Sequence, residues 1–196
     1  MKSLIQKVAL LAGMAFALGW AALAQADEAL WQVARSEPNI VLLLRHTEVA
    51  RQRGQSPTTF DPSGQCRGEF MLSARGREAA AQIGRLFKER GIDPHVVSSA
   101  MCRCRDTAMI AFGRAELDPA LRESFSGDQQ RFREFLDAST RWILRYRGVR
   151  PLVMVMHTPN IDSLTGEPPE EPEMLVTRST DKGELDVLGR ISLYKP

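Results

Sequence analysis

Residues 39–48 read NIVLLLRHTE, and the rest of the chain is best interpreted outward from them. The apolar run 40–44 has the right length for a buried strand of a parallel sheet. It ends in Arg45 and His46, at the edge where open α/β sheets bind their ligands. A guanidinium offers a planar fork suited to phosphate, and a neutral imidazole can act as a nucleophile. Taken alone, the pair is equally compatible with an ordinary polar strand end.

Two further apolar runs end in residues of the same kind. Residues 152–156 are followed by His157 and Thr158. Residues 95–99 lead into a polar turn and then Arg103. Three strand ends therefore deliver two arginines and two histidines, which favours an anion-handling site over a chance polar terminus.

These residues resemble the histidine phosphatase superfamily, whose domain has the phosphoglycerate mutase-like fold. The family carries Arg-His-Gly after its first strand, then Ser-x-x-x-x-Arg-x-x-x-Thr-Ala, Leu-x-Glu and a late strand ending in His. The matching residues here are Arg45, His46, Ser98, Arg103, Thr107, Ala108, Leu121, Glu123 and His157. The resemblance runs from about residue 39 to the C-terminus. It implies a three-layer α/β/α domain with a mostly parallel central sheet and a C-terminal hairpin.

The resemblance also implies a role for each residue of the site. His46 would attack phosphorus and form a phosphohistidine, and Glu123 would protonate the leaving group. The cations would neutralise the phosphoryl oxygens, so neither a metal nor a cofactor is expected. The residues expected to contact substrate are Arg45, Arg103, His157, Thr47, Arg51 and Thr158. Thr47 departs from the usual glycine and brings a methyl and a hydroxyl near the pocket, which bears on the substrate and on a mutase role.

One argument for Arg103 is independent of the family. A helix is expected to begin near Cys102, and an arginine at a helix N-terminus faces the positive end of the dipole. Arg103 and Arg105 at that end make sense if an anion lies between them and the helix.

Residues 1–26 are expected to be a secretory signal peptide. Two lysines precede the apolar run 8–24, and Ala24-Gln25-Ala26 offers small residues for cleavage. The alternative is an uncleaved membrane anchor, because the run of 17 residues is slightly long for a signal core, although it is also slightly short for a span. Cleavage removes both lysines, so the net charge of +2 falls to zero (+2 − 2). A neutral domain has no bulk attraction for nucleic acid or anionic membrane. The resemblance implies a small-molecule or glycan phosphate ester as the partner.

Periodicity and capping residues divide the rest of a single domain without repeats. Helices are expected over residues 27–37, 73–90, 102–111 and 128–147, and a hairpin over 173–178 and 185–193. Residues 49–72 are predicted to form a long functional loop, in which Arg51, Arg53 and Arg67 are candidate contacts for an anionic substrate. Residues 117–127 are expected to be irregular. Gly166, Pro168 and Pro169 are expected to allow only a short turn after His157.

The chain has three cysteines, Cys66, Cys102 and Cys104. In an oxidising compartment one disulfide can form, and Cys66 could pair with either of the other two. The sequence does not choose between these pairings. Together with the three histidines, the cysteines do not show zinc-ligand spacing.

These observations predict a periplasmic histidine phosphatase. Within the superfamily, the layout is most similar to exported phosphatases of the lipopolysaccharide core heptose-phosphate type, which makes such a heptose phosphate the suspected substrate. A catalytically inactive module that binds phosphosugars or the cell envelope on the same fold remains an alternative. A membrane-anchored interaction protein is a third.

Overall fold

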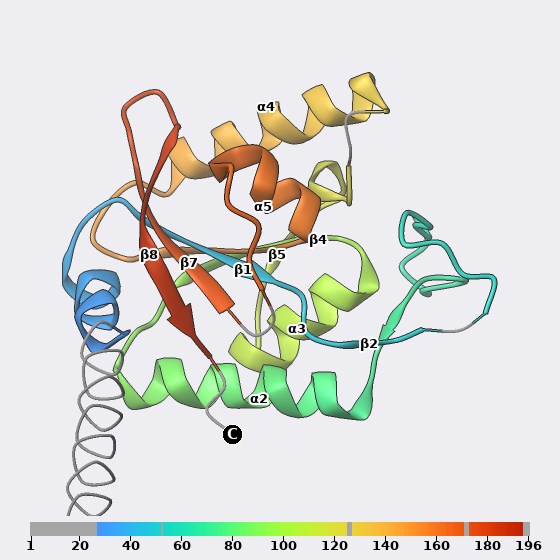
Figure 1. Cartoon of the computed structure of the whole chain (residues 1–196), viewed down its shortest axis with the longest axis horizontal. Helices are drawn as coiled ribbons and strands as arrows, with labels where there is room; N and C mark the ends of the chain where they lie inside the picture. The colour runs from blue at the N-terminus through green and yellow to red at the C-terminus, as the bar shows by residue number, and fades with distance from the viewer. Residues whose placement is uncertain (1–26, 52, 125–126, 171–172, 194–196) are drawn as a thin grey trace, which may run out of the picture.

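The computed structural model describes residues 27–51, 53–124, 127–170 and 173–193 (Figure 1). The expected signal peptide lies outside these residues. A six-stranded sheet with the order β5-β4-β6-β1-β7-β8 forms the centre of the domain. Its strands are β1 (Ile40–Arg45), β4 (His95–Ser99), β5 (Glu116–Asp118), β6 (Leu152–Met156), β7 (Glu173–Ser179) and β8 (Leu185–Ser192).

The pairing of the strands brings the two predicted histidines together. β6 runs parallel to both β1 and β4, and β4 runs parallel to β5. The register pairs Arg45 with Met156, so His46 and His157 follow on neighbouring strands. The His46 N–H donates to the Met156 carbonyl at 3.0 Å and fixes this alignment one residue beyond the strand. β7 and β8 form the predicted antiparallel hairpin, with β7 paired to β1.

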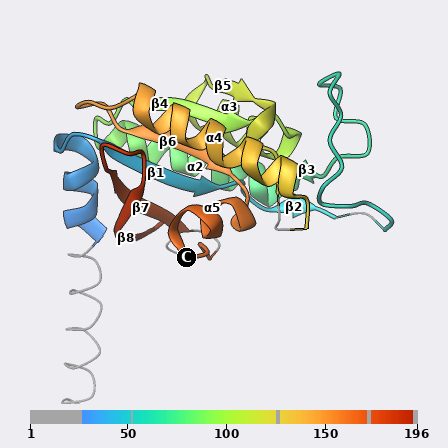
Figure 2. The same ribbon diagram turned by 90° about the horizontal axis from the view of Figure 1, so that it is seen from above.

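Helices cover both faces of the sheet, so the predicted three-layer α/β/α fold is confirmed (Figure 2). One face carries α2 (Ala74–Glu89), α3 (Cys102–Phe112) and a helix over residues 27–36. The other carries α4 (Gln129–Arg145) and α5 (Thr158–Thr165). Successive residues of β1 alternate between the two apolar cores, because side chains of a strand point to opposite faces.

Two predictions about the segments between these elements were wrong. The segment after His157 is the eight-residue helix α5 rather than a short turn. Pro159 is tolerated in its first turn, and Gly166 ends it in a left-handed conformation only after two turns. The segment expected to be irregular also contains β5 and the 3-10 turn η1 (Pro119–Leu121).

The long connection after β1 is a loop that begins and ends in a small antiparallel pair. β2 (Val49–Ala50) pairs with β3 (Met71–Leu72) and closes the base of the loop. Between these strands the loop projects beyond the end of the sheet (Figures 1 and 2). Ser73 then caps α2, as predicted, and accepts a hydrogen bond from the Gly76 N–H.

Helices α2 and α3 approach each other closely at Gly84. A Cβ atom at this position would lie 2.2 Å from the Ala111 carbonyl oxygen. Helix propensity alone would make Gly84→Ala stabilising by about 1 kcal/mol. We expect the opposite sign, a loss of about 1–3 kcal/mol in the free energy of unfolding, because the two backbones must separate. Urea denaturation measures the difference, and an unchanged or higher midpoint would contradict this close contact.

Candidate active site

His46 is a buried, neutral imidazole whose Nε2 is free to attack. Its side chain is 7% exposed, and its Nδ1 lies 3.0 Å from the Thr47 carbonyl oxygen. A carbonyl can only accept, so Nδ1 carries the proton and Nε2 holds a lone pair. Burial, followed by the positive charge of Arg103, lowers the pKa of His46 to about 3. The ring is therefore neutral throughout the physiological pH range.

His157 lies beside His46 and is held on both ring nitrogens. The two ring centroids are 5.5 Å apart. Its Nδ1 lies 3.0 Å from Nη2 of Arg103, which can only donate, and its Nε2 lies 3.1 Å from the Ser99 hydroxyl. Nε2 therefore carries the proton. Burial and the charge of Arg103 hold the pKa of His157 well below its usual range, so this expected substrate contact is a neutral ring.

Arg103 is the centre of the site, with a guanidinium that is 1% exposed. In addition to Nδ1 of His157, its Nη2 contacts the Pro57 carbonyl, at 2.9 Å, and the carboxylate of Glu123. Its Nε and Nη1 are buried and have no hydrogen-bond partner in the described part of the chain. A buried N–H without a partner is costly, so this half of the fork is suited to bind an anion.

The carboxyl of Glu123 lies against this cluster. Its Oε2 contacts Arg103 Nη2 and lies 4.0 Å from Nδ1 of His157. Burial raises the pKa of Glu123, and this effect outweighs the opposing charges of Arg103 and Arg45. The side chain is 15% exposed, so protons can reach it from solvent. A carboxyl with a raised pKa beside an anion site can serve as a general acid.

The anion at the N-terminus of α3 is not the one the sequence argument expected. Oε2 of Glu69, a side chain that is 1% exposed, accepts a hydrogen bond from the Cys102 N–H at 2.8 Å. Its Oε1 accepts from the Asp61 N–H at 2.8 Å and so ties the long loop to the helix. The helix end is therefore satisfied by a carboxylate of the protein, and only Arg103 turns toward the site. Arg105 binds the loop instead, through the Gly64 carbonyl and the Cys66 sulfur.

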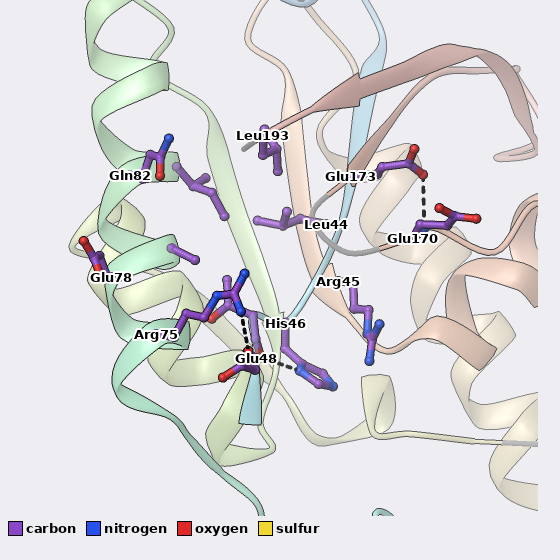
Figure 3. Close-up of a pocket in the computed structure, with 13 residues that line it drawn as sticks. Leu44, Arg45, His46, Glu48, Arg75, Glu78, Gln82, Glu170, Glu173 and Leu193 are labelled. Carbon is purple, nitrogen blue, oxygen red and sulfur yellow. Dashed lines mark hydrogen bonds and ion pairs between the residues drawn. The ribbon is translucent and has the colours of Figure 1, made fainter. Parts of the chain in front are cut away.

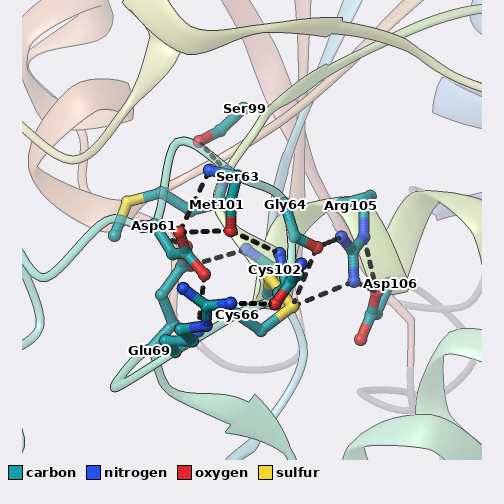
Figure 4. The surroundings of a disulfide bond; sticks show 12 residues. Asp61, Ser63, Gly64, Cys66, Glu69, Ser99, Met101, Cys102, Arg105 and Asp106 are labelled. Atoms are coloured by element: carbon teal, nitrogen blue, oxygen red, sulfur yellow. Dashed lines mark hydrogen bonds and ion pairs between the residues drawn. A yellow bond between two sulfur atoms is a disulfide. The ribbon is translucent and has the colours of Figure 1, made fainter.

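A disulfide joins the loop to the same helix end and settles the pairing that the sequence left open. Cys66 is bonded to Cys102, the residue before Arg103 (Figure 4). Cys104 is a buried free thiol whose Sγ lies 3.5 Å from Nε2 of His157. Burial raises the pKa of Cys104 to about 12, so the thiol is inert. The disulfide and Glu69 together hold the loop whose Pro57 carbonyl binds Arg103.

The other predicted contacts are placed less centrally. The Thr107 hydroxyl donates to the Arg103 carbonyl at 2.7 Å and accepts from the Thr47 N–H at 3.1 Å. The Thr47 hydroxyl lies 3.2 Å from the same oxygen, so it ties β1 to α3 instead of pointing freely at a substrate. Thr158 is half-buried at the start of α5, and Arg51 is exposed on the loop.

Arg45 lies at the end of β1 as predicted and is half-buried. Its charge contributes, after burial and Arg103, to the lowered pKa values of both histidines. Together with His46 it lies at one end of a pocket of about 270 Å³ between α2 and the start of β7 (Figure 3). Arg103, Glu123 and His157 do not line this pocket, which adjoins the cluster without containing it.

Sequence reasoning missed three side chains that support the site: Glu69, Ser99 and Asn160. Each is buried, and each hydrogen-bonds to a residue of the site or to the backbone beside one. Ser99 and Asn160 lie one residue and three residues from the motif positions Ser98 and His157, which is a positional signal. Glu69 lies in an irregular loop and has no sequence signal.

No metal centre is evident where the structure describes the chain. Among the described residues, no group of three or more histidine, cysteine, aspartate or glutamate side chains is arranged to hold a metal ion. None of the helices in the described ranges combines the length and apolar character needed to cross a membrane.

The fold and the cluster at the carboxyl edge of its sheet define a phosphoglycerate mutase-like α/β protein. The model of the histidine phosphatase superfamily, branch 1, matches residues 41–165. The chain therefore belongs to the histidine phosphatase superfamily. The matched stretch contains all the residues predicted for the site, from Arg45 to Thr158. No curated protein sequence matches the chain.

Solved structures of phosphatases share the fold. The protein histidine phosphatase SixA, complexed with tungstate, has a TM-score of 0.54 and 18% identity over 79% of this chain and 97% of that chain. A putative alpha-ribazole-5'-P phosphatase from Escherichia coli K-12 has a TM-score of 0.54 and 17% identity, over 79% and 97%. The mycobacterial glucosyl-3-phosphoglycerate phosphatase gives 0.53 and 17%, over 76% and 96%. At these identities the likeness shows the fold alone.

Proposed function

We propose that this protein is an exported phosphomonoesterase that works without a metal and through a phosphohistidine on His46. The observation that carries the proposal is a nucleophilic imidazole nitrogen of His46 in the same site as a guanidinium, that of Arg103, with two unused hydrogen-bond donors. Nε2 of His46 is unprotonated, and two buried N–H groups of Arg103 have no partner among the described residues. Membership of the superfamily supports the same chemistry.

In the first step, the phosphoryl oxygens accept hydrogen bonds from Nε and Nη1 of Arg103. The positive charge of Arg45 attracts them as well. Preorganised cations of this kind stabilise the charge that develops in the transition state. Nε2 of His46 attacks phosphorus, and the bond from phosphorus to the leaving oxygen breaks. Glu123 gives its proton to that oxygen. Nδ1 keeps its proton and its hydrogen bond to the Thr47 carbonyl, which keeps the ring oriented.

In the second step, Glu123 acts as a base. The carboxylate takes a proton from water, the water oxygen attacks phosphorus, and the bond between phosphorus and Nε2 breaks. Inorganic phosphate leaves, and His46 regains its lone pair. Glu123 ends the cycle protonated, as it began.

These steps predict an acidic pH optimum for kcat/KM with a substrate that has a poor leaving group. His46 must be neutral, and with a pKa of about 3 it is neutral above about pH 4. Glu123 must be protonated in the first step, so kcat/KM is expected to fall as the pH rises through its raised pKa. The profile of kcat/KM against pH for an alkyl phosphate measures this, and Glu123→Gln should remove the alkaline limb. An acid limb centred on the ordinary histidine pKa would contradict a neutral His46.

The disulfide supports the proposed export, because disulfides persist mainly in oxidising compartments outside the cytosol. A phosphorylated sugar of the envelope, such as the heptose phosphate of the lipopolysaccharide core, is the substrate that we propose. Arg51 and Arg53 are exposed on the loop beyond His46 and could meet the further negative charges of such a substrate.

The experiment that tests the activity traps the covalent intermediate. The protein is mixed with labelled 4-nitrophenyl phosphate in the presence of a chelator and quenched in base, where phosphohistidine survives. We expect phosphate release that the chelator does not reduce, and an acid-labile label that maps to His46. Folded protein that gives neither release nor label, with this ester or with phosphosugars, would favour the binding module. Phosphate release from isolated lipopolysaccharide core then tests the substrate.

A further inference from the structure

Asn160 is a buried amide that hydrogen-bonds to the backbone on both sides of Glu123. It lies in the first turn of α5, three residues after His157, and is 0% exposed. Its Oδ1 accepts from the Ser124 N–H at 3.1 Å, and its Nδ2 donates to the Arg122 carbonyl at 3.0 Å. A backbone N–H can only donate and a carbonyl can only accept, which fixes the orientation of the amide.

Residues 122–124 belong to no helix or strand. Among the described residues, their other backbone hydrogen bonds are long: the Arg122 N–H donates to the Pro119 carbonyl at 3.3 Å, and the Glu123 N–H faces the Met101 sulfur, a weak acceptor, at 3.5 Å. The Glu123 carboxylate contacts Arg103, but a side-chain contact leaves the main chain free to shift. The two hydrogen bonds from Asn160 are shorter than these and lie directly on either side of Glu123.

Packing alone does not require an amide at this position. The adjacent Ile161 already anchors α5 in the apolar core formed with α4. An apolar side chain of similar size could fill the volume of Asn160, whereas a buried amide is unfavourable unless its hydrogen bonds are made. The role that remains for the amide is to fix the position of residues 122–124, to which it hydrogen-bonds.

We propose that Asn160 is a positioning residue that sets where the carboxyl of Glu123 meets the leaving oxygen. The inference rests on the proposed function, in which Glu123 is the proton donor. Asn160 and His157 share one helical turn, and His157 also contacts Arg103. The first turn of α5 therefore holds the proton donor and the phosphoryl site in one fixed relation.

The test uses the dependence of turnover on the leaving group. Nitrophenolate leaves without help, whereas an alkoxide needs the proton from Glu123. Hydrolysis of the phosphohistidine is common to both esters, so the first step is compared through kcat/KM. We expect Asn160→Leu to lower kcat/KM for an alkyl phosphate by about 10- to 100-fold, part of the usual contribution of a general acid. The kcat/KM for 4-nitrophenyl phosphate should fall by less than about 3-fold. Ser163→Ala, on the exposed side of α5, is the matched control.

The outcomes separate this inference from the function on which it rests. Equal losses with both esters, or no loss, would show that Asn160 is merely structural. If thermal unfolding shows that Asn160→Leu does not fold, Asn160→Asp takes its place. It keeps the acceptor for Ser124 and loses the donor for Arg122, and it should give the same selective loss in weaker form. Glu123→Gln is the reference: if it lowers kcat/KM for both esters equally, the proton-donor role itself fails, whatever Asn160 does.

Discussion

Replacing His46 with alanine is expected to lower phosphatase turnover on the order of 10⁵-fold and to abolish the phosphoenzyme. The expectation is this large because no neighbouring group in the described part of the chain can take over the attack. The Nδ1 lone pair of His157 is bound by Arg103, and Nε2 of that ring carries a proton. The thiol of Cys104 is buried, and its raised pKa keeps it protonated.

The measurement is kcat with 4-nitrophenyl phosphate together with the base-stable label, for His46→Ala and for a control histidine. His95 is the matched control, because it begins β4 at the opposite edge of the sheet and stacks on Tyr146 with ring centroids 4.4 Å apart. His95→Ala should keep its activity within a few-fold of the wild type. If His46→Ala kept more than about 1% of the activity, or still carried the label, the nucleophile would have to be sought elsewhere.

Replacing Arg103 with lysine is expected to lower kcat/KM for phosphate esters by about 10³-fold. One Nη2 atom binds the Pro57 carbonyl, His157 and Glu123, while the rest of the guanidinium is left for the phosphoryl group. A lysine keeps the charge but provides a single point donor, so it cannot fill both halves of this arrangement. The loss should therefore appear in kcat as well as in KM.

The same substitution should also change the pKa values of the two histidines in the ligand-free site. The charge of Arg103 helps to keep His46 and His157 neutral, so a displaced cation should let both pKa values rise. Titration of the histidine ring protons by NMR measures this. Arg114, which contacts Asp93 on the surface beyond the other end of α3, is the control, and Arg114→Lys should change neither rate nor titration. A kcat/KM within 10-fold of wild type for Arg103→Lys would mean that charge alone suffices.

The central part of the site could be predicted because its residues follow buried strands. The apolar runs before Arg45 and His157 have no other good interpretation than strands of one parallel sheet, and parallel strands end at one edge. The helix 74–89 was equally readable, since Ser73 caps it and its apolar residues recur with helical spacing. These signals are local, so they survive without knowledge of the tertiary structure.

The parts that could not be predicted depend on contacts between distant segments. A lone glutamate in a loop rich in glycine and proline gives no sign that it caps α3, because the cap is formed across 33 residues. The dipole argument at that helix was sound in its physics, but the anion it required is Glu69. The helix α5 was not predicted because Gly166 and Pro168 favour a turn, and the eight residues before them are too few to show a clear helical pattern. Asn160 was missed with it.

The spacing of the three cysteines makes the correct disulfide depend on the order of folding and oxidation. In an unfolded chain, Cys66 closes a loop to Cys102 or Cys104 at nearly the same entropic cost. Once α3 has formed, two residues correspond to a rotation of about 200°, so the two thiols face opposite sides of the helix. Only Cys102 then meets the loop, while Cys104 is buried against His157. A chain that folds before it is oxidised reaches one product. A chain that is oxidised first forms both pairings, and the wrong one must reshuffle.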